Sequence, residues 1–472
     1  MGRKKRKYKI IPDVHFTGMA DKGRSIGRTE EGLVVFAEKV VPGDVADIIV
    51  FKKKGGVDMG RAYEITTPSP DRVEPFCEHF GKCGGCKWQN LNYEAQIKHK
   101  EIVVRDALRR IGKVEVEEFL PIEPAVLTTF YRNKIEFAFS KRRWLAPEEL
   151  NSDVSNEADV LGFFASGFFD KILDINKCWL QPDPSNEIRN GIREMAKESG
   201  LPFFDIRENE GFFRNIMLRI TTTGEVMVIL SFYHNENGEV EQFLDKVVER
   251  FPQITSLMYC INPKLNDIIR DLDILPYKGN DYVEEQLGHV KFKIGPKSFF
   301  QTNTKQAKVL FDKVVEFADL QGTENVYDLY TGIGSIGLYI ADKCKQVVGI
   351  EEVEAAIEDA KENAALNGIE NAVFYVGDVK DILTPEFAEK HGKPDILITD
   401  PPRVGMHAQV VRMLLELEAP KIVYVSCNPA TQARDLNVLA EKYRVVKVQP
   451  VDMFPHTHHI ESVSLLVLKH SI

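Results

Sequence analysis

The sequence contains no run of about 18 or more apolar residues, which is the length that a membrane-spanning helix requires. Its basic start, MGRKKRKYKI, is not followed by an apolar run, so it does not have the pattern of a signal peptide. Internal repeats and low-complexity tracts are also missing, which argues against a repeat architecture. We therefore expect a cytoplasmic protein with no membrane segment. In that compartment its seven cysteines do not indicate a disulfide framework.

Positive charge is scarce overall and unevenly distributed. The 472 residues carry a formal net charge of −10, which argues against a protein that coats nucleic acid over its whole surface. Residues 1–70, however, contain 14 Lys and Arg against 9 Asp and Glu, whereas the other 402 residues contain 47 against 62. A basic end on an acidic body suggests a localised contact with a polyanion.

Length and pattern divide the chain into three parts. At roughly 150 residues per domain the chain corresponds to about three domains, and its hydrophobic content of 43% is enough for several cores. Residues 1–70 alternate short apolar runs with Gly, Asp and Lys turns, which predicts a small antiparallel β-barrel. Such a barrel is either an ordinary solubilising unit or one that binds oligonucleotides. A proline-rich stretch, residues 67–75, ends it.

The rest of the chain changes its pattern near residue 296. Residues 71–295 mix strands and helices, which predicts a central α+β domain with an amphipathic helix over residues 91–111. Residues 296–472 alternate strands with helices, which is typical of a parallel, doubly wound α/β sheet. The expected elements are helices at 303–320, 335–344 and 354–368 and strands at 325–330, 346–351, 372–377, 395–400 and 421–426, followed by two more strands around a loop.

A glycine-rich turn, YDLYTGIGSIGL, follows the first of these strands. Gly332, Gly334 and Gly337 match the dinucleotide fingerprint, with Glu351 about 20 residues further on, so NAD is one candidate ligand. S-adenosylmethionine is favoured, because Asp328 precedes the turn near where a cationic amino-acid end could lie, and because a ligand without pyrophosphate depends less on the helix N-terminus. Glu351 could hold ribose hydroxyls in either case. A purely structural turn is the third alternative.

Acidic residues lie at the ends of two of the expected strands and at the start of another. Asp378 ends the third, where an adenine would fall, and Asp400 ends the strand DILITD and precedes PPRVGM. Ligands of α/β sheets bind at this edge, although an acid at a strand end is also a common N-cap. Glu461 leads into the apolar strand ESVSLLVL, which suits an acid–base group, a surface glutamate being the alternative. The preceding HTHH does not have the spacing of a metal site.

The cysteines fall into separate groups. Cys427 follows the strand KIVYVS, and its position alone allows a buried core residue, a metal ligand or a nucleophile. Cys77, Cys83 and Cys86 lie close together and Cys178 lies farther on. Four thiolates can hold a [4Fe–4S] cluster or a structural zinc ion, and spacing does not separate the two. The remaining two, Cys260 and Cys344, are set in apolar sequence and are expected in the core.

Several motifs together resemble the bacterial RNA uracil-carbon-5 methyltransferases. They are SFFQTN (298–303), DLYTGIGSIGL (328–338), GIE (349–351), DPPRVG (400–405), SCNPAT (426–431) and PHTHHIESV (455–463), and they occur in the family's order along nearly the whole chain. The N-terminal barrel is similar to the family's RNA-binding TRAM domain, and the cysteine set is similar to its iron–sulfur ligands. Both features together most resemble the RumA-type branch, which acts in 23S rRNA processing.

The resemblance implies a role for each site residue. Cys427 would be the nucleophile and Glu461 the general base, and Arg403 would help order the site. Phe299 would stack near the substrate base. S-adenosylmethionine would contact Gln301, Tyr330, Glu351, Asp378 and Asp400, and less securely Ser335, which stands where members often have Asn. A [4Fe–4S] cluster, with zinc as the lesser alternative, would be held by Cys77, Cys83, Cys86 and Cys178.

The implied activity is formation of 5-methyluridine in 23S rRNA by a monomer without an obligate protein partner. A tRNA methyltransferase of the same family, an NAD-dependent oxidoreductase and a non-catalytic RNA-binding iron–sulfur protein are the alternatives. Carbon 5 of uracil is a poor nucleophile until a thiolate adds to carbon 6, and the carbon-5 proton must later be removed by a base. We therefore expect the loop around Cys427 to lower the thiol pKa, or the thiol to lose its proton when the substrate binds. The target uridine must also leave its base stack, which costs about a few kcal/mol and favours an unpaired loop.

Overall fold

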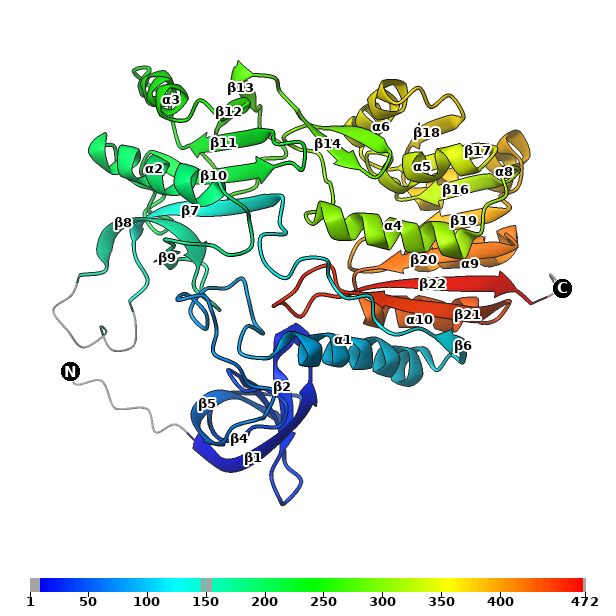
Figure 1. Ribbon diagram of the computed structural model, residues 1–472, viewed down its shortest axis with the longest axis horizontal. Helices are drawn as coiled ribbons and strands as arrows, with labels where there is room; N and C mark the ends of the chain where they lie inside the picture. The colour runs from blue at the N-terminus through cyan, green and yellow to red at the C-terminus, as the bar shows by residue number, and fades with distance from the viewer. Residues whose placement is uncertain (1–8, 146–148, 150–154, 470–472) are drawn as a thin grey trace.

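The structure is a computed structural model that describes residues 9–145, 149 and 155–469. Most of the basic start of the chain therefore lies outside the described residues. The described strands form a closed barrel, a seven-stranded sheet, an eight-stranded sheet and a two-stranded hairpin. In Figure 1 the barrel lies at the bottom, the seven-stranded sheet at the upper left and the eight-stranded sheet at the right. No helix in these residue ranges is both long and apolar enough to cross a membrane.

The barrel contains five strands in the order β1-β2-β3-β5-β4. They are β1 (Lys9–Met19), β2 (Ser25–Arg28), β3 (Val34–Glu38), β4 (Val45–Lys54) and β5 (Val57–Thr67), with the short 3-10 turn η1 (Asp21–Gly23) after β1. Alternate residues face its interior, among them Val14, Phe16, Val35 and Ile48. All pairings are antiparallel except that of β3 with β5, which is parallel, so the expectation of an antiparallel barrel fails at this one pairing. The connection from β3 through β4 makes a parallel pairing possible, and alternation of residues does not reveal strand direction.

The seven-stranded sheet has the order β13-β12-β11-β10-β7-β8-β9. Its strands are β7 (Lys134–Arg142), β8 (Glu157–Phe164), β9 (Ile172–Asp174), β10 (Phe213–Ile220), β11 (Val226–Phe232), β12 (Ser256–Ile261) and β13 (Leu275–Gly279). Helices α2 (Ser185–Glu198) and α3 (Glu239–Arg250) pack on this sheet through a shared apolar core. This agrees with the mixed α+β pattern of the middle sequence.

The eight-stranded sheet has the order β18-β17-β16-β19-β20-β22-β21-β6. Its strands are β6 (Val116–Phe119), β16 (Asn325–Leu329), β17 (Gln346–Glu351), β18 (Ala372–Val376), β19 (Ile396–Thr399), β20 (Lys421–Ser426), β21 (Tyr443–Val451) and β22 (Glu461–Leu468). Strands β16 to β20 are parallel to one another, and β22 runs antiparallel to both β20 and β21. The expected α/β fold is confirmed.

Helices cover this sheet, and one of them comes from much earlier in the chain. They are α4 (Thr304–Ala318), α5 (Ser335–Ile340), α6 (Glu354–Leu366), α7 (Val379–Ile382), α8 (Pro385–His391), α9 (Ala408–Leu417) and α10 (Pro429–Leu439), with the 3-10 turn η3 (Ala341–Lys343) after α5. Helix α1 (Tyr93–Ala107) and the π-helical turn η2 (Leu108–Gly112) pack against α10, and β6 extends the sheet beside β21. The hairpin of β14 (Val283–Leu287) and β15 (Val290–Ile294) packs against α4 and α6.

Helix α4 illustrates how local sequence sets these elements. The side chain of Asn303 accepts a hydrogen bond from the amide of Gln306 and caps the helix, an interaction that contributes about 1 kcal/mol. Ala307, Leu310 and Val314 are buried at helical spacing and face the sheet. The Asn303 amide nitrogen also donates to the carbonyl of Met453 at 2.9 Å, which ties the start of α4 to the loop between β21 and β22.

Candidate active site

The carboxyl ends of the parallel strands meet at one edge of the eight-stranded sheet. Tyr330 follows β16, Glu351 ends β17, Asp400 follows β19 and Cys427 follows β20. Because these strands are parallel, their side chains gather at the edge where α/β sheets bind ligands. The residues that sequence motifs single out thus share one region of the fold.

The glycine turn after β16 is held by a buried carboxylate. Oδ2 of Asp328 accepts hydrogen bonds from the Thr331 hydroxyl at 2.5 Å and from the Gly337 amide at 3.0 Å. A Cβ on residue 337 would lie 2.9 Å from that same oxygen, which explains the glycine. Burial raises the pKa of Asp328 to about 6. Its carboxylate therefore fastens the turn, and this oxygen is not free to receive the cationic end of a ligand as the sequence suggested.

Three of the expected donor-site residues lie around this turn. Glu351 accepts hydrogen bonds from the amides of Gly332 and Val353, each at 3.1 Å, so its carboxylate lies against the glycine turn. Burial raises the pKa of Tyr330, and the charges of Asp378 and Glu351 raise it further, which shows that these groups are neighbours. The turn, Tyr330, Glu351 and Asp378 together form a polar lining at the sheet edge.

Asp378 and Gln301 have their own local contacts. Asp378 caps α7, and its hydrogen bond from the side chain of Lys380 lowers the pKa of the carboxyl. Gln301 is partly buried in the segment before α4, where its carbonyl accepts a hydrogen bond from Asn133 at 2.9 Å. Within the described residues, no hydrogen bond joins the Gln301 side chain to the other four expected donor-site residues. Ser335 is the first residue of α5.

Cys427 is fixed between the end of β20 and the start of α10. The side chain of Asn428 caps α10 by accepting from the Ala430 amide at 3.1 Å, and Pro429 is the first helical residue. Asn428 also donates to the carbonyl of Arg403 at 2.9 Å, which ties this loop to the loop after Asp400. The sequence Ser-Cys-Asn-Pro therefore makes a defined turn that holds Cys427 at the sheet edge.

Glu461 reaches the same place from the neighbouring strand. Strands β20 and β22 pair antiparallel with Ser426 opposite Ser462, so one residue further along Cys427 lies across from Glu461. Glu461 is only 4% exposed, and its burial, followed by the charge of Asp400, raises the pKa of its carboxyl well above the usual range. In the described part of the chain, the Glu461 carboxyl has no hydrogen-bond partner, so it is available to a ligand.

The thiol of Cys427 is in an unfavourable place for a thiolate when no ligand is bound. A helix N-terminus tends to lower a thiol pKa, yet burial and the charges of Glu461 and Asp400 raise the pKa of Cys427 to about 12, with Arg403 opposing them. Burial and Asp328 likewise raise the pKa of Asp400 to about 7. The expectation that the loop lowers the thiol pKa is therefore wrong for the ligand-free chain, because desolvation and neighbouring carboxylates dominate.

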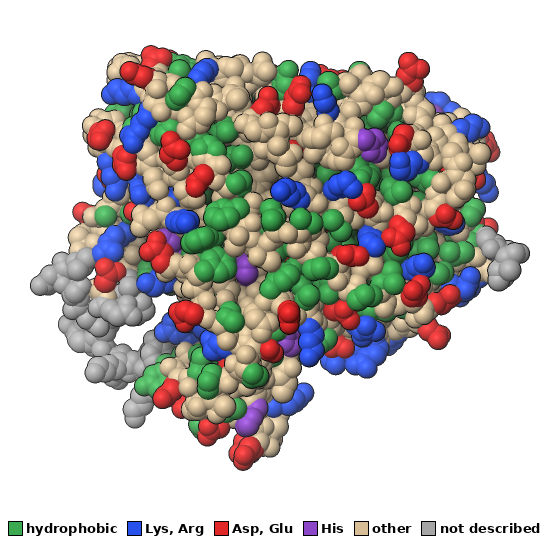
Figure 2. Space-filling view, in the orientation of Figure 1, with side chains coloured by type: hydrophobic (Ala, Val, Ile, Leu, Met, Phe, Trp, Pro, Cys, Tyr) green, Lys and Arg blue, Asp and Glu red, His purple; other side chains and the backbone are tan. Residues whose placement is uncertain are grey.

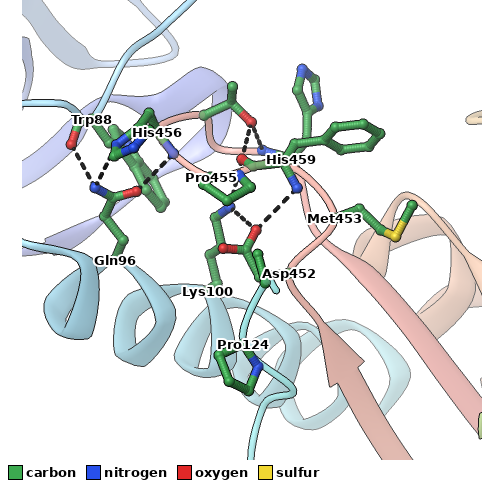
Figure 3. A network of polar contacts seen from close by, with 12 residues as sticks. Trp88, Gln96, Lys100, Pro124, Asp452, Met453, Pro455, His456 and His459 are labelled. Atoms are coloured by element: carbon green, nitrogen blue, oxygen red, sulfur yellow. Dashed lines mark hydrogen bonds and ion pairs between the residues drawn. The ribbon is translucent and has the colours of Figure 1, made fainter. Parts of the chain in front are cut away.

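The loop between β21 and β22 is anchored by residues of α1, as Figure 3 shows. Nζ of Lys100 lies 2.6 Å from Oδ1 of Asp452 and donates to the carbonyl of Phe454 at 3.0 Å, and the side chains of both Lys100 and Asp452 are fully buried. Gln96 accepts from the His456 amide at 2.8 Å and contacts Nδ1 of the same histidine at 3.1 Å. Val451, just before Asp452, pairs with Glu461, so these contacts fix the start of the strand that carries Glu461.

Sequence reasoning did not identify this anchor. The signal that could have found it is a lysine and a glutamine, Lys100 and Gln96, on the buried face of the amphipathic helix. A buried lysine requires a partner, which here is 352 residues away in the chain.

His459 in the same loop lies 3.4 Å from Arg403, and burial lowers its pKa to about 3, so it is neutral near pH 7. Phe299, expected beside the substrate base, is 65% exposed.

The four cysteines of the expected metal set lie in one part of the fold. Burial raises the pKa of Cys77, Cys83, Cys86 and Cys178, and the pKa of Cys86 is raised further by the other three thiols, so the four lie near one another. All four are free cysteines, which suits a thiolate-bound metal centre in its chemistry. Yet among residues 9–145, 149 and 155–469 no three His, Cys, Asp or Glu side chains are placed to hold a metal ion. The donor types fit such a centre, but their present spacing does not.

Known proteins similar to this chain define its family. A family model described as tRNA (Uracil-5-)-methyltransferase matches residues 221–469. An uncharacterized RNA methyltransferase of Bacteroides thetaiotaomicron is 51% identical over 455 residues, covering 96% of this chain and 100% of the relative. The chain belongs to the tRNA (uracil-5-)-methyltransferase family. An uncharacterized RNA methyltransferase of Porphyromonas gingivalis is 52% identical over 462 residues, with 96% and 99% of the two chains covered.

A solved structure of the uracil-5-methyltransferase family has the same overall fold. The tRNA (uracil-54, C5)-methyltransferase of Pyrococcus abyssi, in complex with S-adenosyl-L-homocysteine, matches with a TM-score of 0.73 and 30% identity, covering 96% of this chain and 100% of the other. The resemblance seen in the sequence is thereby confirmed, and so is its implication that the chain is an RNA (uracil-5-)-methyltransferase rather than an NAD-dependent oxidoreductase. The family description names tRNA, whereas the two relatives are named only as RNA methyltransferases, so the choice of RNA stays a prediction.

Proposed function

We propose that the protein transfers a methyl group from S-adenosylmethionine to carbon 5 of a uridine in 23S rRNA, giving 5-methyluridine through a covalent adduct of Cys427. The observation that carries this proposal is the pairing of β20 with β22, which sets Cys427 across from Glu461 beside the glycine turn. A thiol and a carboxyl facing one another at a ligand-binding edge suit the addition to carbon 6 and the proton removal from carbon 5.

Bound S-adenosylmethionine supplies the methyl group and a positive sulfonium charge. Tyr330, Glu351 and Asp378 lie around the glycine turn that would receive it, and Asp400 and Gln301 complete the proposed donor site. Asp400 lies close enough to Cys427 for its charge to raise the pKa of the thiol. A cation bound next to Asp400 would offset that repulsion, which gives donor binding a way to assist thiol ionisation.

The protein groups then act in two stages. The proton of Cys427 passes to solvent and the sulfur adds to carbon 6, and donors directed at the uracil oxygens stabilise the enolate that forms. Arg403 contacts His459 and opposes the pKa rise of both Cys427 and Glu461, so its positive charge would lie near the developing negative charge. After methylation, ionised Glu461 takes the carbon-5 proton, the sulfur–carbon bond breaks and Cys427 is released. Exposed Phe299 would stack on the uracil.

The assignment to 23S rRNA rests on the resemblance of the barrel and cysteine set to the rRNA branch. A tRNA substrate is the second candidate, because the family description and the similar Pyrococcus abyssi enzyme both name tRNA. Methyl transfer from labelled S-adenosylmethionine into unmodified transcripts separates the two. The proposal predicts labelled 5-methyluridine in 23S rRNA and none in tRNA, and the reverse result would assign the tRNA activity instead.

We also infer that Cys77, Cys83, Cys86 and Cys178 hold a [4Fe–4S] cluster, with zinc as the alternative. Their grouping, their burial and their free thiols support this, and a structural or RNA-positioning role is expected. Anaerobic reconstitution should give about four iron and four sulfide per chain, whereas binding of one zinc ion would favour the alternative.

We further infer a cytoplasmic monomer without an obligate partner and with units at residues 1–70, 71–295 and 296–472, which sizing chromatography and limited proteolysis would test.

A further inference from the structure

Two adjacent phenylalanines are exposed at the tip of the hairpin formed by β8 and β9. Phe169 is 74% exposed and Phe168 is 46% exposed, and both lie in the turn of residues 165–171. Large aromatic side chains in such positions lose favourable burial, so a pair of them on one turn calls for a partner. Neither ring takes part in the proposed methyl transfer.

The backbone of this turn is rigidly held. Ala165 donates to the carbonyl of Lys171 at 2.8 Å across the turn. The amide of Gly84 donates to the carbonyl of Phe164 at 3.0 Å, and that of Ser166 donates to the carbonyl of Lys82 at 2.9 Å, so the turn adds a short strand to the cysteine segment. Nζ of Lys87 also donates to the Ser166 hydroxyl at 2.7 Å. The rings are thus presented from a fixed frame, which reduces the entropy lost on binding.

The surroundings of the two rings are basic. The ammonium of Lys171 lies 4.5 Å from the centre of the Phe168 ring, which leaves Phe169 as the more open of the two. Lys82, whose carbonyl accepts a hydrogen bond from the Ser166 amide of the turn, is exposed and lies over Trp144. The one acidic residue of the turn, Asp170, is buried and bound to Arg207. Cations beside open aromatic rings favour a polyanion whose bases can stack.

A short chain of contacts joins this turn to the active-site loop. Lys87, which holds Ser166, donates its backbone amide to the carbonyl of His456 at 2.8 Å, in the loop that leads to Glu461. In Figure 1 the β8–β9 hairpin and the barrel lie on the side of the molecule toward which the β21–β22 loop points. In Figure 2 acidic and basic side chains are interspersed over the visible face, so a local site of this kind does not conflict with the negative total charge.

We propose that Phe168 and Phe169 form a stacking platform for unpaired bases of the substrate RNA next to the target uridine, with Lys171 and Lys82 contacting its phosphates. The platform rests on the proposed function, because it requires an RNA with single-stranded nucleotides near the active site. It would hold the strand on one side of the flipped base and would add affinity without taking part in the chemistry.

The direct test is binding of an unstructured oligouridine of about 16 nucleotides, long enough to cover such a site, and of an unmodified 23S rRNA transcript. Phe168→Ala/Phe169→Ala should weaken oligouridine binding about tenfold or more and raise KM for the transcript, while kcat at saturating transcript stays near the wild-type value. Phe169→Trp should retain the affinity and Phe169→Leu should weaken it, because only an aromatic face stacks on a base.

Leu265→Ala is the matched control, since Leu265 is 72% exposed in the segment between β12 and β13. Wild-type affinity in the double variant, or retention by Phe169→Leu equal to that by Phe169→Trp, would overturn the platform. A fall in kcat without a change in KM would also overturn it, because the rings would then act in catalysis or folding. Binding of oligouridine needs no methyl transfer, so failure of the proposed activity would be seen separately in the methylation assay.

Discussion

Cys427 lies across from Glu461 because β20 and β22 pair antiparallel with Ser426 opposite Ser462. The two residues belong to different motifs of the sequence. The pairing of β20 with β22 brings them together at the end of the sheet. The charge of Glu461 contributes to the raised pKa of Cys427, whereas burial and the charge of Asp400 raise the pKa of Glu461. Near pH 7 the thiol of Cys427 is therefore held in its neutral form in the ligand-free chain.

Replacing the carboxyl of Glu461 should stop the reaction after methylation. In Glu461→Gln no base takes the carbon-5 proton, so the sulfur–carbon bond cannot break and the RNA stays attached to Cys427. A denaturing gel should show a covalent protein–RNA band that requires S-adenosylmethionine. Glu370→Gln, a change at a residue for which the structure gives no active-site contact, is the control and should give no such band. Normal turnover by Glu461→Gln would contradict the assignment of Glu461 as the base.

The raised thiol pKa predicts a slow and pH-dependent reaction of Cys427 with iodoacetamide. Below its pKa of about 12 the thiolate fraction rises about tenfold per pH unit, so alkylation should increase steadily from pH 7 to pH 10. An ordinary thiol, with a pKa near 8.5, would level off within that range. Mass spectrometry of the peptide that contains Cys427 separates it from the other cysteines.

The rate of alkylation also tests why the pKa of Cys427 is raised. Glu461→Gln removes a carboxyl whose charge raises the pKa of Cys427, so alkylation of the variant should be faster at every pH of the range. Bound S-adenosylmethionine should likewise accelerate it if the sulfonium offsets Asp400. A plateau already at pH 8 in the ligand-free protein would show that the thiol is not held neutral.

Breaking the buried ion pair of α1 should affect both stability and the base. Lys100→Met leaves Asp452 buried without its cation, which costs about 3 to 5 kcal/mol in the free energy of unfolding measured with urea. Because Asp452 follows the residue that pairs with Glu461, the variant should also accumulate the covalent RNA adduct. Lys308→Met removes an exposed pair with Asp312 and should change stability by less than about 1 kcal/mol.

Lys100→Met/Asp452→Leu keeps the site neutral and should recover part of the lost stability. If that double variant were as unstable as Lys100→Met, the cost would lie in packing instead of an unpaired charge. Turnover without adduct in a folded Lys100→Met protein would show that the anchor does not position Glu461.

The glycine turn should not tolerate a side chain at residue 337. A Cβ there would lie 2.9 Å from Oδ2 of Asp328, so Gly337→Ala must displace the carboxylate that holds the turn. We expect the Kd for S-adenosylmethionine, measured by calorimetry, to rise at least about tenfold, a loss of about 1.4 kcal/mol. Gly322→Ala, where a Cβ would meet no atom within 4 Å, should reduce stability through its φ of +89° but leave donor affinity unchanged.

Much of the fold could be predicted because its signals are local. Strand ends, glycines and caps are set by neighbouring residues, so the positions of Asp400 and Cys427 at the sheet edge followed from the order of strands. The anchor of Lys100 on Asp452 could not be predicted, since it depends on a contact across 352 residues. The parallel pairing of β3 with β5 and the internal use of Asp328 likewise depend on tertiary packing. Of the two expectations for the thiol, a lowered pKa is wrong for the ligand-free chain, because burial is not visible in a motif, and loss of the proton on substrate binding stays a prediction.

The proposed mechanism requires Cys427 to form the bond to uracil. The most direct test is methyl transfer from labelled S-adenosylmethionine into an unmodified 23S rRNA transcript by Cys427→Ala, with donor binding measured in parallel. We expect no methyl incorporation and an unchanged Kd for S-adenosylmethionine, because the thiol is needed to activate carbon 5 but lies outside the proposed donor contacts. Methylation by Cys427→Ala at the wild-type rate would contradict it.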